Sequence, residues 1–244
     1  MVSHAQPALQ VIGLAKRFRD QAGKRIDVLE HVDLTVRPGV LTVIEGAPGA
    51  GRTTLLRCLY RTHVPDRGRM YLTAGGMCME LAAARPMQVS WARRCHVRLF
   101  DGSLAVPDRA TGHAVLVRAL RRTSLTAAIA ERRAVNALSR AGISPDRPVR
   151  LLSEAERRFI AVLLALLPEA SVVLLDEPSV PDEHGAALLT LIAEACQRGA
   201  AVVATAPVGS DLAAGADQVL LLQQGRVMEV SRSGASGRVR NLLA

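Results

Sequence analysis

The stretch Val40-Leu-Thr-Val-Ile-Glu-Gly-Ala-Pro-Gly-Ala-Gly-Arg-Thr-Thr54 decides the fold of this chain. It begins as an apolar run typical of a buried strand, and a glycine-rich loop and a helical pattern follow. Gly46, Gly51 and Thr53 match the phosphate-binding pattern G-x-x-x-x-G-K followed by Ser or Thr. Arg52 stands where that pattern has lysine. The stretch therefore predicts a strand, a loop for phosphate groups and a helix, with altered chemistry at one position.

Arg52 changes what the loop is expected to do. In such a loop, backbone N–H groups and a helix N-terminus surround the phosphates, and the lysine reaches them as a compact charge. Arginine keeps the charge, but its planar fork is larger and prefers bidentate partners. Binding of ATP and hydrolysis of ATP are therefore separate questions. The loop residues predicted to bind nucleotide are Gly46, Ala47, Pro48, Gly49, Ala50, Gly51, Arg52, Thr53 and Thr54.

A second motif, Val172-Val-Leu-Leu-Asp176-Glu177-Pro178, is an apolar strand that ends in two carboxylates. Together with a phosphate-binding loop, an Asp at such a strand end holds Mg²⁺, here with Thr53, and the next Glu polarises the attacking water. The pair of motifs is much more specific than either motif alone. We therefore predict ATP and Mg²⁺ as cofactors, with Thr53 and Asp176 at the metal and Glu177 as the catalytic residue.

Composition favours one globular unit. The chain has 244 residues, and 49% of them are hydrophobic, which excludes a disordered protein. The longest apolar run, Phe159 to Leu167, is too short to span a bilayer, and the sequence shows no export leader. The four cysteines form no C-x-x-C pair, which favours plain thiols in a reducing compartment. We expect a cytoplasmic protein with no direct insertion into a membrane.

Positive charge is concentrated in the middle of the chain. The net charge is +9, and the segment from Arg85 to Arg158 holds 15 arginines against six acidic residues. The segment is interpreted either as a basic face for an acidic partner or nucleic acid, or as an ordinary solvated helical surface, and the second interpretation is favoured. Aromatic residues make up only 2% of the chain, so nucleic acid is not an expected partner.

The pattern of strands and helices predicts a doubly wound α/β fold. Strand patterns before and after the loop give way to a mainly helical pattern over 86–167, and alternating strands and helices return after it. We expect a single domain over 1–244, with an α/β core formed by 8–85 and 168–230, a helical subdomain at 86–167 and a flexible tail at 231–244. Ligands of such sheets bind at the carboxyl ends of the parallel strands.

Over residues 8–230 the chain resembles the nucleotide-binding domains of the ABC ATPase superfamily, in the order and spacing of these motifs. The resemblance implies a P-loop NTPase fold of ABC type: a doubly wound core sheet, an antiparallel β subdomain and an inserted helical subdomain. Within the superfamily, the chain looks most like the L subunit of the bacterial phosphonate carbon-phosphorus lyase system. The segments that carry this closer likeness are Val28–Gly39, Thr53–Tyr60, Val64–Gly68 and Arg198–Val203.

The resemblance also assigns roles to single residues. Phe18 falls where the family places an aromatic ring against adenine, although a core phenylalanine on an edge strand is an equal alternative. Asp176 and Glu177 fall at the magnesium and catalytic carboxylates, and Asp182 near the acidic residue of the next loop. The family's signature loop reads L-S-G-G-Q or L-S-G-G-E, with groups that touch the ATP of the opposite subunit. The corresponding residues here are Ser153, Glu154, Ala155 and Glu156.

At several positions near the expected γ-phosphate site the sequence differs from the family's pattern. Glu154 near a γ-phosphate would cost about 4 kcal/mol for unit charges about 4 Å apart at an effective dielectric of about 20. Arg157 or Arg158 is an alternative partner that would neutralise the glutamates. Gly102 falls where the family has a glutamine, and Ala204-Thr-Ala-Pro207 lacks the family's histidine. None of the six histidines receives a role.

Three functions remain open. The first is an ATP-binding subunit of the carbon-phosphorus lyase pathway with weak or absent hydrolysis, whose partners are other subunits of that system, a homologous ABC subunit or a second copy of itself. The second is the ATPase of an ABC transporter. The third is a pseudo-ATPase that serves as an interaction module. Arg52, Glu154 and Ala155 favour reduced turnover, whereas the intact loop and Asp176-Glu177 favour retained nucleotide chemistry.

Overall fold

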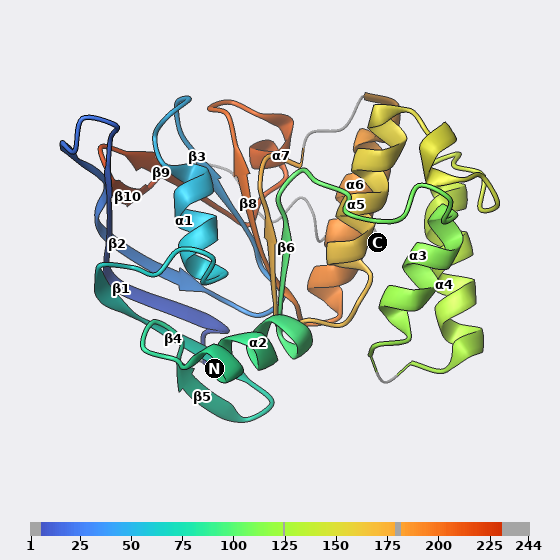
Figure 1. The fold of residues 1–244 in the computed structure, drawn as a ribbon, viewed down its shortest axis with the longest axis horizontal. Coiled ribbons are helices and arrows are strands. Elements are labelled where there is room, and N and C mark those ends of the chain that lie inside the picture. The colour runs from blue at the N-terminus through green and yellow to red at the C-terminus, as the bar shows by residue number, and fades with distance from the viewer. Residues whose placement is uncertain (1–5, 124, 179–181, 231–244) are drawn as a thin grey trace.

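A mixed β-sheet runs through the molecule, and helices cover it (Figure 1). The computed structural model describes residues 6–123, 125–178 and 182–230. The strands are β1 (Leu9–Arg19), β2 (Arg25–Val36), β3 (Leu41–Glu45), β4 (Arg67–Ala74), β5 (Met77–Glu80), β6 (Val97–Phe100), β7 (Val172–Leu175), β8 (Ala201–Ala206), β9 (Gln218–Gln223) and β10 (Arg226–Glu229). The helices are α1 (Arg52–Leu59), α2 (Pro86–Cys95), α3 (Gly112–Leu120), α4 (Ala127–Arg140), α5 (Glu154–Leu166), α6 (Asp182–Gln197) and α7 (Asp211–Ala214), with a 3₁₀ turn at Val149–Leu151.

The strand order separates a parallel core from an antiparallel part. Across the sheet the order is β5-β4-β1-β2-β10-β9-β3-β8-β7-β6. The parallel core is the run β9-β3-β8-β7-β6, in which each strand is parallel to the next. The antiparallel part is the run β5-β4-β1-β2. This arrangement confirms the predicted fold class: a P-loop type α/β sheet with an added antiparallel β part.

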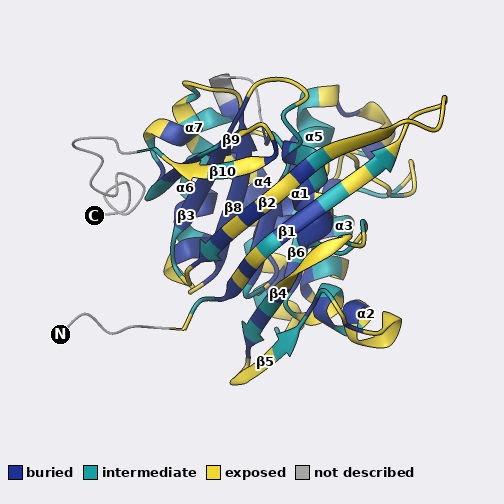
Figure 2. Cartoon of the chain, turned by 90° about the vertical axis from the view of Figure 1, so that its left-hand side faces the viewer, coloured by how far each residue is buried: buried dark blue, intermediate teal, exposed yellow. Residues whose placement is uncertain are grey.

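Helices lie on both faces of the parallel core, because its strands alternate side chains between two hydrophobic clusters. Val173 and Leu175 of β7 join the cluster that contains α5 and α6, and Val172 and Leu174 join the cluster that contains α1 and α2. Strands buried on both faces read as continuous apolar runs, and β3, β7 and β8 are buried at every position. Figure 2 shows this buried centre beside the half-exposed strands of the antiparallel part.

One strand lies inside the segment for which the sequence predicts mainly helices. Strand β6 pairs in parallel with β7, so residues 97–100 belong to the core sheet. From residue 112 onward the segment is helical, and α3, α4 and α5 pack together through a cluster that includes Leu116, Leu138 and Ile160. The flexible tail predicted at 231–244 lies outside the described residues.

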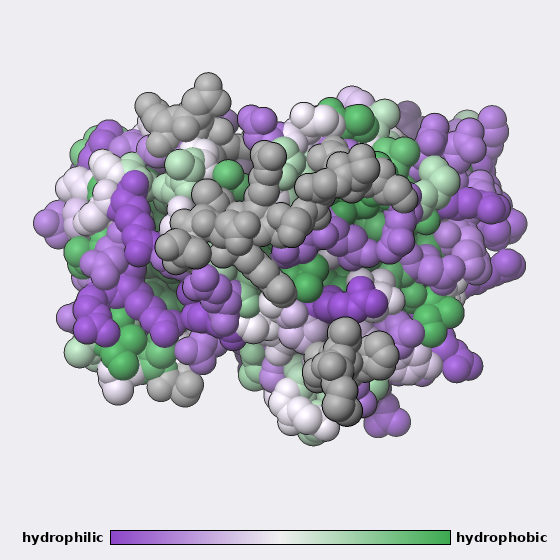
Figure 3. Space-filling model, turned by 180° about the vertical axis from the view of Figure 1, so that it is seen from behind, coloured by the Kyte–Doolittle hydropathy of each residue, from purple (hydrophilic) through white to green (hydrophobic). Residues whose placement is uncertain are grey.

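Helix length and surface hydropathy bear on whether the described part of the chain spans a membrane. Within the described ranges, no helix has the length and apolar character needed to cross a bilayer. On the rear face, small hydrophobic groups alternate with hydrophilic ones wherever the atoms are coloured (Figure 3). Of the four cysteines, Cys58 and Cys196 are buried, and Cys78 and Cys95 are exposed. Burial raises the pKa of Cys58 to about 12, so this thiol is protonated at neutral pH.

Candidate functional site

The loop from Gly46 to Thr54 joins the carboxyl end of β3 to α1, and its backbone requires glycine at two positions. Gly51 precedes α1 with φ of 98°, a left-handed conformation that favours glycine, and a Cβ there would lie 2.9 Å from Val28 Cγ1. A Cβ on Gly46 would lie 2.8 Å from the carbonyl oxygen of Leu222. The loop therefore keeps the close backbone path and the helix N-terminus that suit an anionic ligand.

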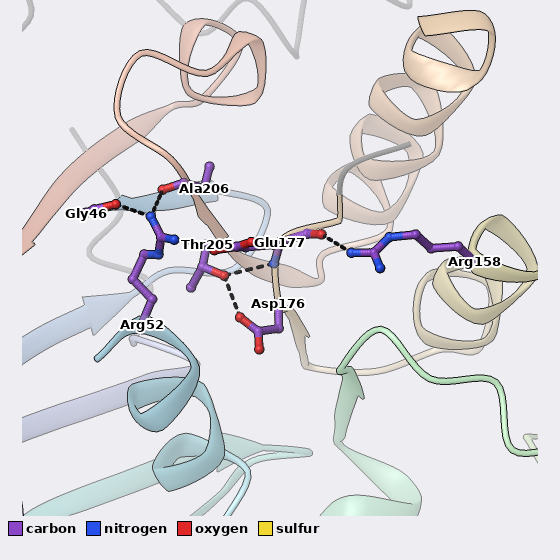
Figure 4. A network of polar contacts seen from close by, with 7 residues as sticks. All are labelled: Gly46, Arg52, Arg158, Asp176, Glu177, Thr205 and Ala206. Carbon is purple, nitrogen blue, oxygen red and sulfur yellow. Dashed lines mark hydrogen bonds and ion pairs between the residues drawn. The ribbon is translucent and has the colours of Figure 1, made fainter. Parts of the chain in front are cut away.

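Arg52 turns back from the first turn of α1 toward the ends of β7 and β8. Its side chain is only 8% exposed. Nη1 donates to the carbonyl oxygens of Gly46 and Ala206, the latter at 2.8 Å, and Nη2 forms an ion pair with Oε1 of Glu177 (Figure 4). The guanidinium thus bridges the start of the loop, the end of β8 and the predicted catalytic carboxylate. A lysine ammonium has no planar fork with which to join these three groups in the same way.

Glu177 is fixed at three points. Its backbone N–H donates to Thr205 Oγ1 at 2.9 Å, its carbonyl accepts from Arg158 Nη2 at 2.7 Å, and its carboxylate accepts from Arg52. Its φ is 45°, which is uncommon for a residue other than glycine and persists only where the surroundings hold it. These contacts hold the residue in an unfavourable conformation and turn its carboxylate toward Arg52.

Thr205 links the two carboxylate residues. It lies on β8, between β3 and β7, and it is fully buried. Besides accepting from Glu177, its hydroxyl donates to Asp176 Oδ1 at 2.8 Å (Figure 4). Among the described residues none donates to the second carboxylate oxygen of Asp176, which leaves this oxygen for another ligand. The donor set of Thr53 hydroxyl and Asp176 carboxylate oxygen suits a hard cation such as Mg²⁺.

Arg158 was not predicted to act at this position. It lies on α5, its guanidinium carbon is 5.4 Å from the centre of the Phe100 ring, and it donates to the Glu177 carbonyl. Gly102, where the family glutamine was expected, has φ of 87°, and a Cβ there would lie 3.5 Å from Arg158 Nη1. Residue 102 therefore borders the arginine that holds Glu177 and brings no side chain of its own.

The signature-like residues form the start of α5. Ser153 Oγ accepts from the N–H of Glu156 at 3.1 Å, and the Glu156 carboxylate accepts from the N–H of Ser153, which is a capping box. Arg147 pairs with Glu156 at 2.9 Å, so the arginine that neutralises this glutamate is not one of the two considered from the sequence. Glu154 is exposed. Figure 1 shows α5 and α1 on opposite sides of β6, so these residues lie apart from the loop of the same chain.

Phe18 lies on β1 and is half-buried outside both hydrophobic clusters, which argues against the core alternative. Its ring meets His63 edge to face, with centroids 5.3 Å apart, and Lys16 Nζ lies 5.3 Å from its centre. Burial, followed by the nearby Arg57 and Lys16, lowers the pKa of His63 below its ordinary value, so His63 is neutral at pH 7. The Phe18 ring is thus held between His63 and Lys16. Its contact with adenine stays a prediction.

Sequence reasoning missed two residues that contact Glu177. They are Thr205 and Arg158. Thr205 carries a weak signal, since it is the polar residue near the end of an otherwise apolar strand. In the stretch that lacks the family's histidine, a backbone group makes a contact at the site: the carbonyl oxygen of Ala206 accepts a hydrogen bond from Arg52. His184 packs instead against Phe159, with ring centroids 5.3 Å apart. The side chain of Asp182 lies outside the described residues.

Curated relatives are ATP-binding proteins of transport systems. The L-cystine transport system ATP-binding protein TcyN of Escherichia coli (strain K12) is 29% identical over 238 residues, which cover 91% of this chain and 89% of that protein. The lipoprotein-releasing system ATP-binding protein LolD 2 of Chlorobaculum tepidum is 27% identical over 232 residues, with coverage of 90% and 91%. The pyoverdine export ATP-binding/permease protein PvdT of Pseudomonas syringae pv. tomato is 28% identical, but this chain spans only 34% of its length.

Solved structures show the same fold. A dimeric ATP-binding cassette in a post-hydrolysis state with ADP and Pi superposes with a TM-score of 0.77 at 15% identity, covering 92% of this chain and 100% of that one. A nucleotide-free cassette from an ABC transporter gives a TM-score of 0.71 at 16% identity, with coverage of 98% and 95%. The family model described as ABC transporter matches residues 29–180, which include the loop, the signature-like residues and both carboxylates. The chain therefore belongs to the ABC transporter family of ATP-binding proteins.

Proposed function

We propose that this chain is the ATP-binding subunit of a transport system, that it binds ATP with Mg²⁺ at Gly46–Thr54, and that it hydrolyses ATP slowly. The observation that carries the proposal is the ion pair of Arg52 with Glu177. The residue that replaces the lysine of the phosphate loop binds the carboxylate that the family uses to polarise water. The same contact therefore involves the loop that binds ATP and the carboxylate needed for its hydrolysis, which supports ATP binding with slow hydrolysis.

The loop supplies the binding part of this function. Backbone amides from Gly46 to Thr54 and the N-terminus of α1 surround the phosphates, while Thr53 and Asp176 hold Mg²⁺. When bound, the metal neutralises phosphate charge and orients the terminal phosphate. Thr205 keeps Asp176 oriented through its hydroxyl. Phe18, beside His63 and Lys16, offers an aromatic surface for the adenine.

Arg52 limits the catalytic part. Oε1 of Glu177 accepts from Arg52, so while this contact is closed only the other carboxylate oxygen remains to accept a proton from water. Arg52 in turn is held by the carbonyls of Gly46 and Ala206 and has to leave at least one of its three partners to reach a phosphate. Opening of the Arg52–Glu177 contact therefore favours hydrolysis, and the closed contact slows turnover.

Two alternatives keep their own support. The L subunit of the carbon-phosphorus lyase system is favoured by the segments Val28–Gly39 and Arg198–Val203, whereas the relatives described above are transport proteins and favour the transport function. A pseudo-ATPase that acts only as an interaction module is favoured by the position of Arg52 itself. Pairing with a homologous subunit or a second copy follows from family membership in all three cases.

Calorimetry with ATP tests the nucleotide part. The wild type is titrated with ATP in Mg²⁺ and in EDTA, beside Asp176→Asn. We expect micromolar affinity that depends on Mg²⁺ and is about tenfold weaker in the variant, since a metal ligand is lost. Absence of binding at about 1 mM ATP would leave only the interaction module.

Affinity purification of the tagged chain from whole native cells, lysed in mild detergent, tests the partner. A partner with membrane-spanning helices supports the transport function. Recovery with soluble carbon-phosphorus lyase subunits overturns it in favour of that alternative, whatever the result of the ATP titration.

A further inference from the structure

A hollow of about 640 Å³ lies between α6, α7 and Glu177. Gly185, Leu188 and Leu189 line it from α6, and their spacing of three and four residues puts them on one face of that helix. Leu212 lines it from α7. We call this site the α6–α7 hollow. Its volume lies within the range of about 300–1,000 Å³ that is usual for small-molecule sites.

Apolar groups form most of the wall of the α6–α7 hollow. Leu188 is buried and Leu189 is half-buried, and Leu212 packs against the hydrophobic cluster that contains Leu188. The end of β8 adds Ala206 and Pro207, which lie in the stretch that lacks the family's histidine. Because these two side chains are short, the hollow stays open beside Glu177.

The charged side chains at the hollow are acidic. Glu177 and Asp211 line it, and the part of the lining that the structure describes includes no lysine or arginine. Glu177 binds Arg52 through Oε1, but its side chain is 44% exposed, so the carboxylate can accept a second donor from the hollow. Asp211 is exposed in the first turn of α7. Two carboxylates at the edge of an apolar hollow favour a ligand that carries positive charge.

The combination of leucines and carboxylates indicates which ligand fits. An anion would meet two like charges, and a neutral apolar molecule would bury carboxylates without a partner. A metal ion prefers a set of several oxygen ligands, and no group of three or more His, Cys, Asp or Glu side chains among the described residues could hold one. A small molecule with an apolar ring system and an ammonium group matches both parts of the wall.

We infer that the α6–α7 hollow binds a small amphiphilic amine, with its rings against the leucines of α6 and α7 and its ammonium group at Glu177 and Asp211. Ammonium groups donate charge-assisted hydrogen bonds to carboxylates, and the leucines remove the apolar rings from water. The amine shares Glu177 with Arg52, so under the proposed function its binding also changes ATP turnover. Binding of the amine itself requires no nucleotide.

Calorimetric titration of the full chain with tryptamine, without nucleotide and at about 0.15 M salt, tests the inference. Tryptophol and indoleacetate are the matched ligands, because they end in a neutral hydroxyl and a carboxylate where tryptamine ends in an ammonium group. We expect saturable binding of tryptamine with a Kd of about 0.1 mM, and binding of tryptophol that is about fivefold weaker. Indoleacetate should not bind.

Gly185→Leu is the variant that fills the hollow. A Cβ at residue 185 would meet no described atom of another element within 4 Å, so the new side chain fits without displacing its neighbours. We expect tryptamine to bind about tenfold more weakly to this variant and equally well to Ala128→Leu, which adds a leucine to the exposed side of α4. Asp211→Asn should reduce the preference for tryptamine over tryptophol to about twofold.

Three results would overturn the inference: no saturable binding of tryptamine up to about 5 mM, equal affinities for tryptamine and indoleacetate, or unchanged binding in folded Gly185→Leu. Circular dichroism shows whether that variant folds. If it does not, Asp211→Asn decides, because residue 211 is exposed, and an unchanged preference for tryptamine contradicts the inference. Since the titration contains no ATP, its result is independent of whether the chain binds or hydrolyses nucleotide.

Discussion

Arg52 and Glu177 stand 125 positions apart in the sequence and form an ion pair at the carboxyl edge of the sheet. Arg52 is 8% exposed, whereas the Glu177 side chain is 44% exposed. The arginine is therefore fixed by its carbonyl partners, and the glutamate is the member of the pair that can leave. Because Glu177 is open to water, the pair contributes about 1 kcal/mol or less, which bound phosphates can offset.

Glu177→Gln is expected to strengthen ATP binding. The substitution keeps the shape of the side chain and removes the negative charge that competes with phosphate for Arg52. Affinity should rise by about threefold to fivefold, which corresponds to about 1 kcal/mol or less. Calorimetry measures the change, with Glu131→Gln on the exposed side of α4 as the control. Weaker binding in Glu177→Gln would mean that the carboxylate positions Arg52 for the phosphate.

Thr205→Val is expected to loosen both carboxylate residues at once. Valine has nearly the same shape, but it leaves the N–H of Glu177 without its acceptor and Asp176 without a donor. Loss of a buried partner costs about 1–3 kcal/mol, so the free energy of unfolding in urea should fall by that amount. Thr190→Val, which removes a bond to Ala186 O on the surface of α6, should change it by less than about 0.5 kcal/mol. Equal effects of the two variants would argue against a special role for Thr205.

Strands of the parallel core could be predicted because their residues are apolar throughout. β3 and β7 each read as a short apolar run next to glycines or carboxylates, and the structure has strands at Leu41–Glu45 and Val172–Leu175. β6 was not predicted, since Val97-Arg-Leu-Phe100 is short and contains a charge. Its assignment depends on pairing with β7, far along the chain.

The altered chemistry at residue 52 could be predicted from the sequence, but the direction in which the Arg52 side chain points could not. The sequence shows an arginine with a fork too large for the lysine position. Only the three-dimensional arrangement brings Ala206 and Glu177 within reach of that fork, because β8 and β7 lie side by side next to β3. The partner of Glu156 was unpredictable for the same reason: Arg147 approaches it from the turn before α5.

Glu154→Gly with Ala155→Gly is expected to promote dimerisation in the presence of ATP. Glu154 is exposed at the start of α5, where the family presents glycine N–H groups to the ATP of a second subunit. Removing the carboxylate removes the repulsion of a γ-phosphate. Size-exclusion chromatography with and without ATP detects the dimer, and Ala155→Gly alone serves as the control. An elution volume that ignores ATP in the double variant contradicts the expectation.

Asp66 should make the stability of the antiparallel part depend on pH. Its carboxylate accepts from the backbone N–H of Arg17 at 2.7 Å and lies beside Lys16, and these contacts hold its pKa below its ordinary value of 3.8. Since the folded pKa is lower than the unfolded one, the stabilisation is present above about pH 4 and is lost as the pH falls through the folded pKa. Urea unfolding should show wild type more stable than Asp66→Asn at pH 6, with the difference shrinking below pH 4. A difference that is constant across this range would contradict the assignment.

Turnover of ATP by wild type beside Arg52→Lys tests the central claim most directly. A lysine ammonium is compact and lacks the wide planar fork that spans Gly46 O, Ala206 O and Glu177, so the variant should free the carboxylate and place a compact charge at the phosphates. We expect ATP affinity and single-turnover hydrolysis both to rise by about tenfold, equivalent to about 1.4 kcal/mol each, with Arg57→Lys on α1 as the unchanged control. Hydrolysis by wild type that equals or exceeds that of Arg52→Lys would show that the arginine serves its own ligand and does not restrain Glu177.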